Sequence, residues 1–186
     1  PAAYPWQVVE TSWSGKQIDL KRPDLGASRI KLEGWITYDI ASELFNNSGL
    51  DLEEQKLKAL SRDFKPIAME GLKLNAQLRN KLSFSTSHNV AAVKEGVLRP
   101  DEYILFMAHW DHLGTREGHS PGNDQIYNGA VDNATGVAGI LELANYFKTK
   151  ETDRSLLFLA VTAEESGLLG SEYFGEYPPI ELANIV

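Results

Sequence analysis

The chain has 186 residues, and its 18 basic and 26 acidic side chains leave a formal net charge of −8. That balance argues against nucleic acid or an anionic membrane as a partner, because either requires a basic surface. Hydrophobic residues make up 42% of the chain, enough for the core of one domain or of one domain plus part of another. The chain lacks cysteine, which excludes disulfides and thiolate metal sites. No apolar run approaches the roughly 20 residues that a membrane-spanning helix needs.

Two helices are predicted after an irregular, aromatic stretch that covers residues 1–36. Thr37 is suited to cap the first helix, because apolar residues follow it with helical spacing. Asp51 is suited to cap a second helix from residue 52 to about 62. The leucines of this second helix that we expect to face inward are Leu57 and Leu60.

An α/β arrangement is predicted for the rest of the chain. Alternating apolar residues within 69–97 indicate antiparallel strands, and the apolar run 103–108 indicates a buried strand. A helix over about 134–148, a second apolar strand at 155–161 and a helix that starts near 168 follow. This order predicts a mixed, largely parallel sheet flanked by helices.

His109 and Asp111 directly follow the first apolar strand. Residues two apart in an extended chain point to the same side, so Asp111 can orient the imidazole of His109 toward a metal. The alternative is an ordinary polar loop after a strand.

Asp132 lies just ahead of the helix predicted from 134. An aspartate there commonly caps the helix for backbone reasons alone. The same turn can also direct the carboxylate into a cleft, so both roles stay open.

Glu164 and Glu165 follow the second apolar strand, where open α/β sheets place their ligands. One carboxylate can bind a metal while its neighbour reaches the water on that metal. The alternative is a solvated turn whose glutamates favour the N-terminus of the next helix.

The combination is more specific than its parts, because all five residues lie at strand ends or directly before helices. Carboxylates gathered without a cation would repel one another, and their pKa values would rise. Divalent metals remove that repulsion, and a set of imidazole and carboxylate ligands suits zinc.

Three stretches, residues 109–114, 128–136 and 162–171, resemble the signature segments of the co-catalytic zinc exopeptidases. That family includes bacterial leucyl aminopeptidases, aminopeptidase Y and glutamate carboxypeptidase. The resemblance implies a two-zinc aminopeptidase that acts on a peptide substrate and is secreted or periplasmic.

The resemblance also implies a role for each site residue. His109 would bind one zinc ion with Asp111 orienting it, and Asp132 would bridge both ions. Glu165 would bind the second zinc ion, and Glu164 would be the general base.

The chain departs from the family pattern in one respect. The complete site needs a further aspartate and a distant histidine, whereas no Asp or His follows Glu165. We therefore expect a fragment: residues 1–66 as the remnant of a protease-associated domain with linking helices, and 67–186 as the first portion of the catalytic domain. An unpaired sheet edge would then favour self-association.

Three alternatives remain. A glutaminyl cyclase shares the scaffold but uses one zinc ion for acyl transfer, and receptor ectodomains keep the fold without the ligands. A carboxypeptidase or deacylase of the related co-catalytic group fits the 132–136 turn less well. Side-chain specificity is not readable from these residues.

Overall fold

The computed structural model describes residues 5–12, 14–115, 122 and 124–186. The chain divides into two compact units, one formed by residues 1–16 and 24–83 and the other by residues 17–23 and 84–186. Within the described ranges, no helix is long and apolar enough to cross a membrane. The proposed division at residue 66, with a protease-associated remnant before it, stays a prediction.

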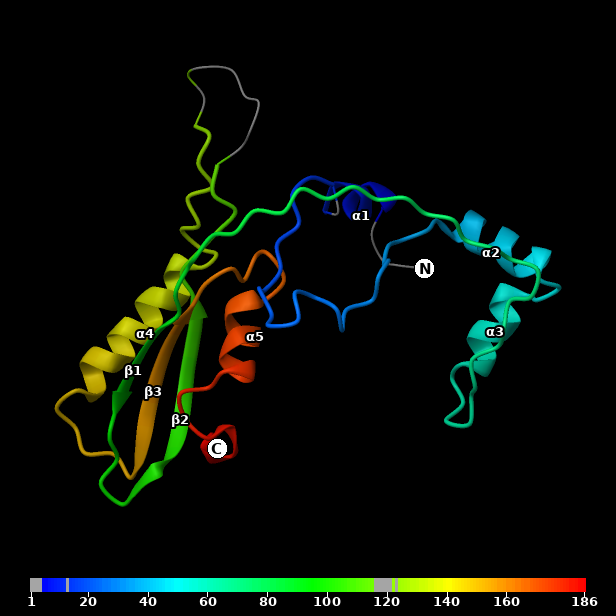
Figure 1. Ribbon diagram of the computed structural model, residues 1–186. Helices are drawn as coiled ribbons and strands as arrows, with labels where there is room; N and C mark the ends of the chain where they lie inside the picture. The colour runs from blue at the N-terminus through cyan, green and yellow to red at the C-terminus, as the bar shows by residue number, and fades with distance from the viewer. Residues whose placement is uncertain (1–4, 13, 116–121, 123) are drawn as a thin grey trace. The chain divides into compact units, whose positions relative to one another are not determined.

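The second unit is built on a three-stranded sheet, formed by β1 (Val90–Lys94), β2 (Arg99–His109) and β3 (Arg154–Val161). The spatial order is β1-β3-β2, so the strand that comes last in sequence is central (Figure 1). β3 pairs parallel with β2 and antiparallel with β1. The expected α/β class with a mixed sheet is confirmed, although the sheet is small.

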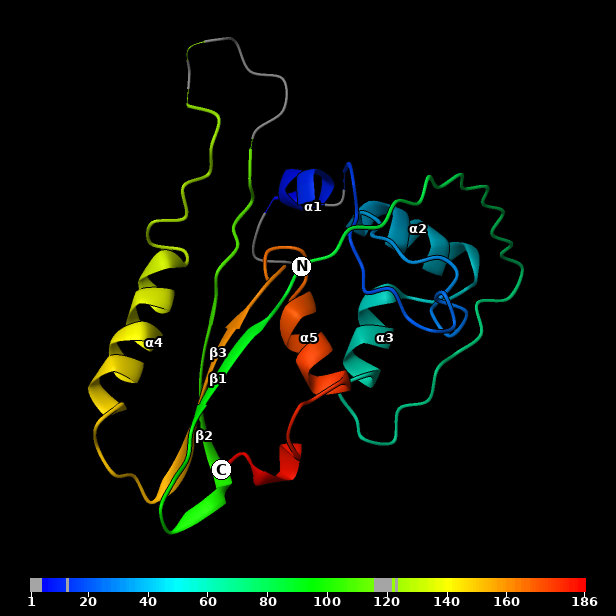
Figure 2. The ribbon, with the colours of Figure 1, turned by 60° about the vertical axis from the view of Figure 1, so that its left-hand side comes forward.

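Two helices cover the sheet on opposite faces, α4 (Ala134–Phe147) and α5 (Leu169–Glu176), as Figures 1 and 2 show. β3 is buried almost throughout because both of its faces are covered. Its side chains facing α5 form the core with one aromatic ring of that helix. The core residues, each no more than 8% exposed, are Leu157, Leu159, Val161 and Phe174.

The chain leaves α5 at two prolines and turns through a short 3-10 helix, η1 (Leu182–Asn184). Ile185 then forms a parallel bridge with Tyr103, on the edge of β2 that β3 does not occupy. Both side chains pack against the core. The final residues therefore extend the sheet by a single bridge.

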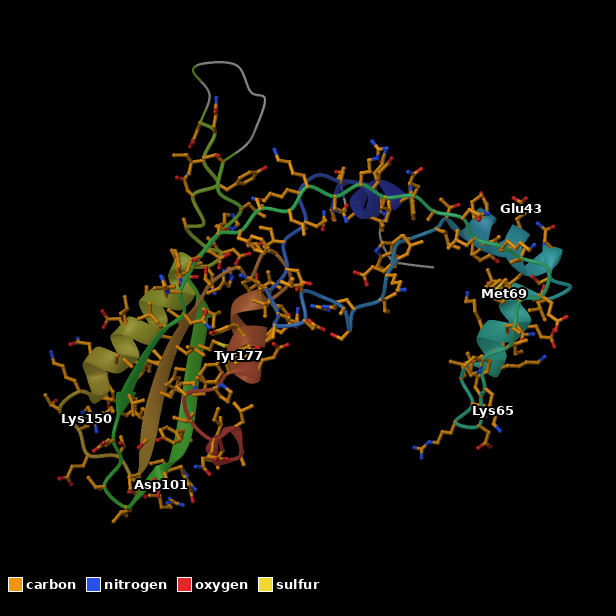
Figure 3. All side chains as sticks on the ribbon, in the orientation of Figure 1. Glu43, Lys65, Met69, Asp101, Lys150 and Tyr177 are labelled. Atoms are coloured by element: carbon orange, nitrogen blue, oxygen red, sulfur yellow. The ribbon has the colours of Figure 1, made fainter. Side chains whose placement is uncertain are left out.

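Charged residues cluster where β2 and β3 begin, the end of the sheet marked by Asp101 and Lys150 in Figure 3. The guanidinium Nε of Arg154 donates to Glu102 Oε2 at 2.5 Å. Ser155 is fully buried beside them, where its hydroxyl accepts from the Gly96 amide and donates to the Pro100 carbonyl. These contacts stabilise the N-terminal ends of β2 and β3. The candidate site lies at the opposite end of the sheet, where both strands end.

The segment formed by residues 17–23 is joined to helix α5 of this unit by Arg22. Arg22 forms ion pairs with Glu172 and Glu176 on α5, and its side chain is only 14% exposed. The two glutamates lie one helical turn apart, so one guanidinium reaches both.

The first unit contains α1 (Trp6–Ser12), α2 (Tyr38–Asn47) and α3 (Leu52–Lys58). Both predicted caps are confirmed, because Thr37 and Asp51 accept hydrogen bonds from backbone amides three residues later. A helix cap involves only residues that are close in the sequence, so it can be predicted from the sequence. Helix α1 was not predicted, since its short run has no clear apolar period.

Three expectations for residues 52–89 are wrong. Leu57 and Leu60 are 70% and 82% exposed, not inward-facing, and α3 ends at Lys58. Residues 69–89, all of them described, contain no strand. Alternation shows which side chains could share a face, but a strand forms only where a neighbouring strand accepts its hydrogen bonds.

The stability of the second unit depends on the central strand. We expect Leu159→Ala to lower the free energy of unfolding by about 3 kcal/mol, because it opens a cavity at a fully buried position. Leu141→Ala on α4, where the side chain is 64% exposed, is the control and changes it by less than about 0.5 kcal/mol. Urea denaturation measures both. Equal effects would contradict this account of the core.

Candidate metal centre

The register of the parallel pair brings the candidate residues to one edge of the sheet. His109, the last residue of β2, lies opposite Val161, the last residue of β3. The amide of Trp110 donates to the Val161 carbonyl at 3.0 Å, so the two chains leave the sheet together. Beyond that point the Glu164 amide donates to Asp111 Oδ1 at 3.2 Å. The two loops are therefore joined directly by a predicted site residue from each.

His109 is 8% exposed, and the main chain holds its ring. Nδ1 lies 3.0 Å from the carbonyl oxygen of Asp111 but 3.8 Å from the Asp111 carboxylate. The nearer partner is thus the backbone of Asp111, while its carboxylate accepts from Glu164. A proton on Nδ1 that is donated to this carbonyl leaves Nε2 with a free lone pair, the form that binds metal.

Two carboxylates face the other ring nitrogen of His109. Nε2 lies 3.0 Å from Asp132 Oδ1 and 3.7 Å from Glu164 Oε2. Burial lowers the pKa of His109, but the hydrogen bond with the Asp111 carbonyl and the nearby negative charges outweigh it, so the pKa is raised above its ordinary value. The site therefore favours positive charge at this ring.

Asp132 does not cap α4. That role belongs to Asn133, whose side-chain oxygen accepts from the Gly136 amide at 3.0 Å. The alternative explanation for an aspartate here is therefore removed. Its carboxylate turns to His109 instead and stays 67% exposed. The peptide bond between Asp132 and Asn133 is cis.

Glu165 has a partner that the sequence did not identify. Its Oε1 lies 2.6 Å from His112 Nδ1, and the rings of His112 and Tyr127 form a T-shaped pair with centroids 6.0 Å apart. His112 falls within the 109–114 stretch, three residues after His109, and that position was the only signal for it. Glu165 is thus linked to the β2 loop but not to His109.

The donors of this site suit zinc, although within the described part of the chain no three His, Asp or Glu side chains are grouped closely enough to hold a metal. Two ligands of one tetrahedral zinc ion, each about 2.0–2.1 Å from it, lie about 3.3 Å apart. The 3.0 Å between His109 Nε2 and Asp132 Oδ1 is close to that value. His109 and Asp132 therefore lie at about the spacing of two ligands of one zinc ion, whereas Glu165 is paired with His112.

Residues 89–186, more than half of the chain, match peptidase family M28. The chain belongs to peptidase family M28. The match covers the whole sheet, both of its helices and all five candidate residues. It confirms the resemblance to zinc exopeptidases noted for the three sequence stretches.

Several curated proteins are similar to part of this chain. Aminopeptidase NAALADL1 from Mus musculus is 32% identical over 112 residues, which is 57% of this chain and 13% of that protein. Aminopeptidase YwaD from Bacillus subtilis is 33% identical over 94 residues, 50% and 18% of the respective lengths. A probable zinc metalloprotease from Pyrenophora teres is 37% identical over 87 residues, 45% and 17%. The chain thus spans less than a fifth of each of these three relatives.

Gly129 controls the approach of the Asp132 turn to the β2 loop. Its φ is +62°, and an added Cβ would meet the Asp132 carbonyl at 2.9 Å and His112 Cβ at 3.1 Å. We expect Gly129→Ala to destabilise the unit by about 1–2 kcal/mol and to weaken zinc binding, because the turn must shift.

The matched control is Gly139→Ala on α4, where an added Cβ meets open space. It is expected to stabilise the helix by about 0.5–1 kcal/mol. Urea denaturation and zinc titration calorimetry measure the two variants. Unchanged stability and zinc affinity in Gly129→Ala would contradict the proposed packing of this turn.

Proposed function

We propose that the protein is a zinc-dependent exopeptidase, an aminopeptidase that hydrolyses N-terminal peptide bonds. The observation that carries this proposal is the convergence of Asp132 and Glu164 on Nε2 of the buried His109. Membership of peptidase family M28 and the names of the relatives support it.

We further propose that the complete site holds two zinc ions. His109 would hold one ion, Glu165 the other, and the exposed carboxylate of Asp132 would bridge them. The bound zinc would polarise the scissile carbonyl and lower the pKa of a water molecule. The residues beside His109 supply imidazole and carboxylate donors, the set that zinc prefers.

Glu164 is the proposed general base. Its amide is fixed on the Asp111 carboxylate, while its own carboxylate is one-third exposed and lies 3.7 Å from His109 Nε2. A carboxylate so placed can take a proton from the attacking water and deliver it to the departing amine. Asp111 acts through position, because one oxygen of its side chain holds the Glu164 backbone.

The names of two relatives favour an aminopeptidase over a single-zinc glutaminyl cyclase. The non-catalytic alternative is disfavoured by the presence of all five side chains in one cluster of loops. A secreted or periplasmic location remains a proposal that rests on family resemblance.

If Glu164 is the general base, its replacement should lower kcat without changing zinc affinity. Glu164→Gln is expected to lower kcat by about 10²–10⁴-fold while zinc affinity stays within about threefold, because no proton acceptor remains and the ligands are intact. Glu142→Gln on the exposed side of α4 is the control. Steady-state kinetics and zinc calorimetry on the protein in its natural length are the measurements. Surviving turnover in Glu164→Gln would make the assignment wrong.

The aminopeptidase proposal predicts a requirement for a free N-terminus. Aminoacyl-p-nitroanilides are expected to be hydrolysed in zinc-containing buffer, and their N-acetylated counterparts to react at least 100-fold more slowly. Samples of the protein in its natural length, analysed for metal after dialysis, are expected to hold two zinc ions per chain. One tightly held ion with cyclisation of an N-terminal glutamine would favour the cyclase.

A further inference from the structure

The side chain of Asn89 bonds both ends of the loop that carries Glu164 and Glu165. Asn89 lies directly before β1 and is half-buried. Its Oδ1 accepts from the Thr162 amide at 3.1 Å, and its Nδ2 donates to the Gly170 carbonyl at 2.7 Å. One carboxamide therefore joins the end of β3 to the first turn of α5.

The loop between these two anchors is strained. Ala163 and Leu168 have φ values of +53° and +63°, a region that residues with a Cβ rarely adopt. Such conformations persist only where the surroundings enforce them. Two internal bonds, from the amides of Leu168 and Leu169 to the carbonyls of Glu164 and Ala163, shape the turn. These two bonds lie within the loop. Asn89 ties the two ends of the loop to the start of β1, while Asp111 and His112 hold its middle to the β2 loop.

The junction that Asn89 spans is tightly packed. A Cβ on Gly170 would meet the Thr162 carbonyl at 2.2 Å and Asn89 Oδ1 at 2.8 Å. The first turn of α5 therefore lies directly against the end of β3, with the carboxamide at the contact. A side chain at Asn89 needs both a donor and an acceptor at this short reach, and asparagine supplies both.

The two residues before Asn89 contact the residues that directly follow β2 and β3. The His88 carbonyl accepts from the Trp110 indole at 3.1 Å, and the Ser87 hydroxyl lies 2.7 Å from that of Thr162. Residues 87–89 thus contact the chain just beyond both β2 and β3. Residues 87–89 can therefore position both the loop after β2 and the loop after β3.

We propose that Asn89 is a positioning residue for the two glutamates. It touches neither substrate nor metal and acts by holding the loop ends at the separation that presents Glu164 and Glu165 on the His109 side. This inference rests on the proposed zinc peptidase function for its kinetic consequences. Its structural consequence, the ordering of residues 163–169, is independent of that function.

The test compares Asn89→Asp with Asn145→Asp in the protein in its natural length. Aspartate keeps the size and the acceptor of Asn89 but presents a carboxylate oxygen to the Gly170 carbonyl, which repels it. Asn145 is exposed on α4, so its variant adds the same charge away from the loop. Zinc calorimetry on Asn89→Asp is expected to show binding weakened by about 10–100-fold, with the control within twofold of the unaltered chain.

Kinetics separate positioning from general destabilisation. At saturating zinc, kcat of Asn89→Asp on an aminoacyl-p-nitroanilide is expected to fall at least tenfold while KM stays within about threefold, because the altered groups contact no substrate. A lowered melting temperature with unchanged zinc affinity and unchanged kcat would overturn the proposal, since that result describes a merely structural residue.

Amide hydrogen exchange tests the same inference without zinc or turnover. The amides of Leu168 and Leu169 are expected to exchange at least tenfold faster in Asn89→Asp than in Asn145→Asp. Unchanged exchange would overturn the positioning role. Absence of zinc binding and turnover in the unaltered protein would instead contradict the proposed function. Failure of the positioning role and failure of the proposed function therefore give different results.

Discussion

The parallel pairing of β2 with β3 is the constraint on which the candidate site depends. Its register sets His109 opposite Val161, so both chains leave the sheet at the same edge. The loop after β2 then contributes Asp111 while the loop after β3 contributes Glu164, and a hydrogen bond joins them. A shift of one residue would turn His109 to the other face of the sheet, away from both carboxylates.

The second constraint is electrostatic. The carboxylates of Asp111, Asp132, Glu164 and Glu165 each lie within 4 Å of one of two imidazole rings. Here each imidazole is shared with carboxylates: His109 with Asp132 and Glu164, and the second histidine with Glu165. The pKa of His109 is raised in part because the negative charges of Glu164 and Asp132 lie close to its ring. A divalent cation carries two positive charges, so it would balance the negative charge of these carboxylates more fully than one proton on His109 would. This is the physical reason to propose a metal at this edge of the sheet.

Close backbone approach is the third feature, and it depends on small or short side chains. Gly129 lets the Asp132 turn reach the β2 loop, and Gly170 lets α5 start against the end of β3. Asn89 fills the remaining gap with a group that both donates and accepts. The acidic side chains supply the chemistry, and these three residues determine how near to one another their loops can come.

The sequence by itself determined the helix caps at Thr37 and Asp51 and the two apolar strands, and it proposed the five candidate residues, because capping, apolar runs and local motifs are properties of neighbouring residues. It misjudged residues 69–89, where alternation lacked a partner strand, and it did not foresee His112 or Asn89 as partners. Only the tertiary structure decided those pairings. Hydrogen bonds between residues 53 to 81 positions apart depend on strand register and loop path, which no local pattern encodes.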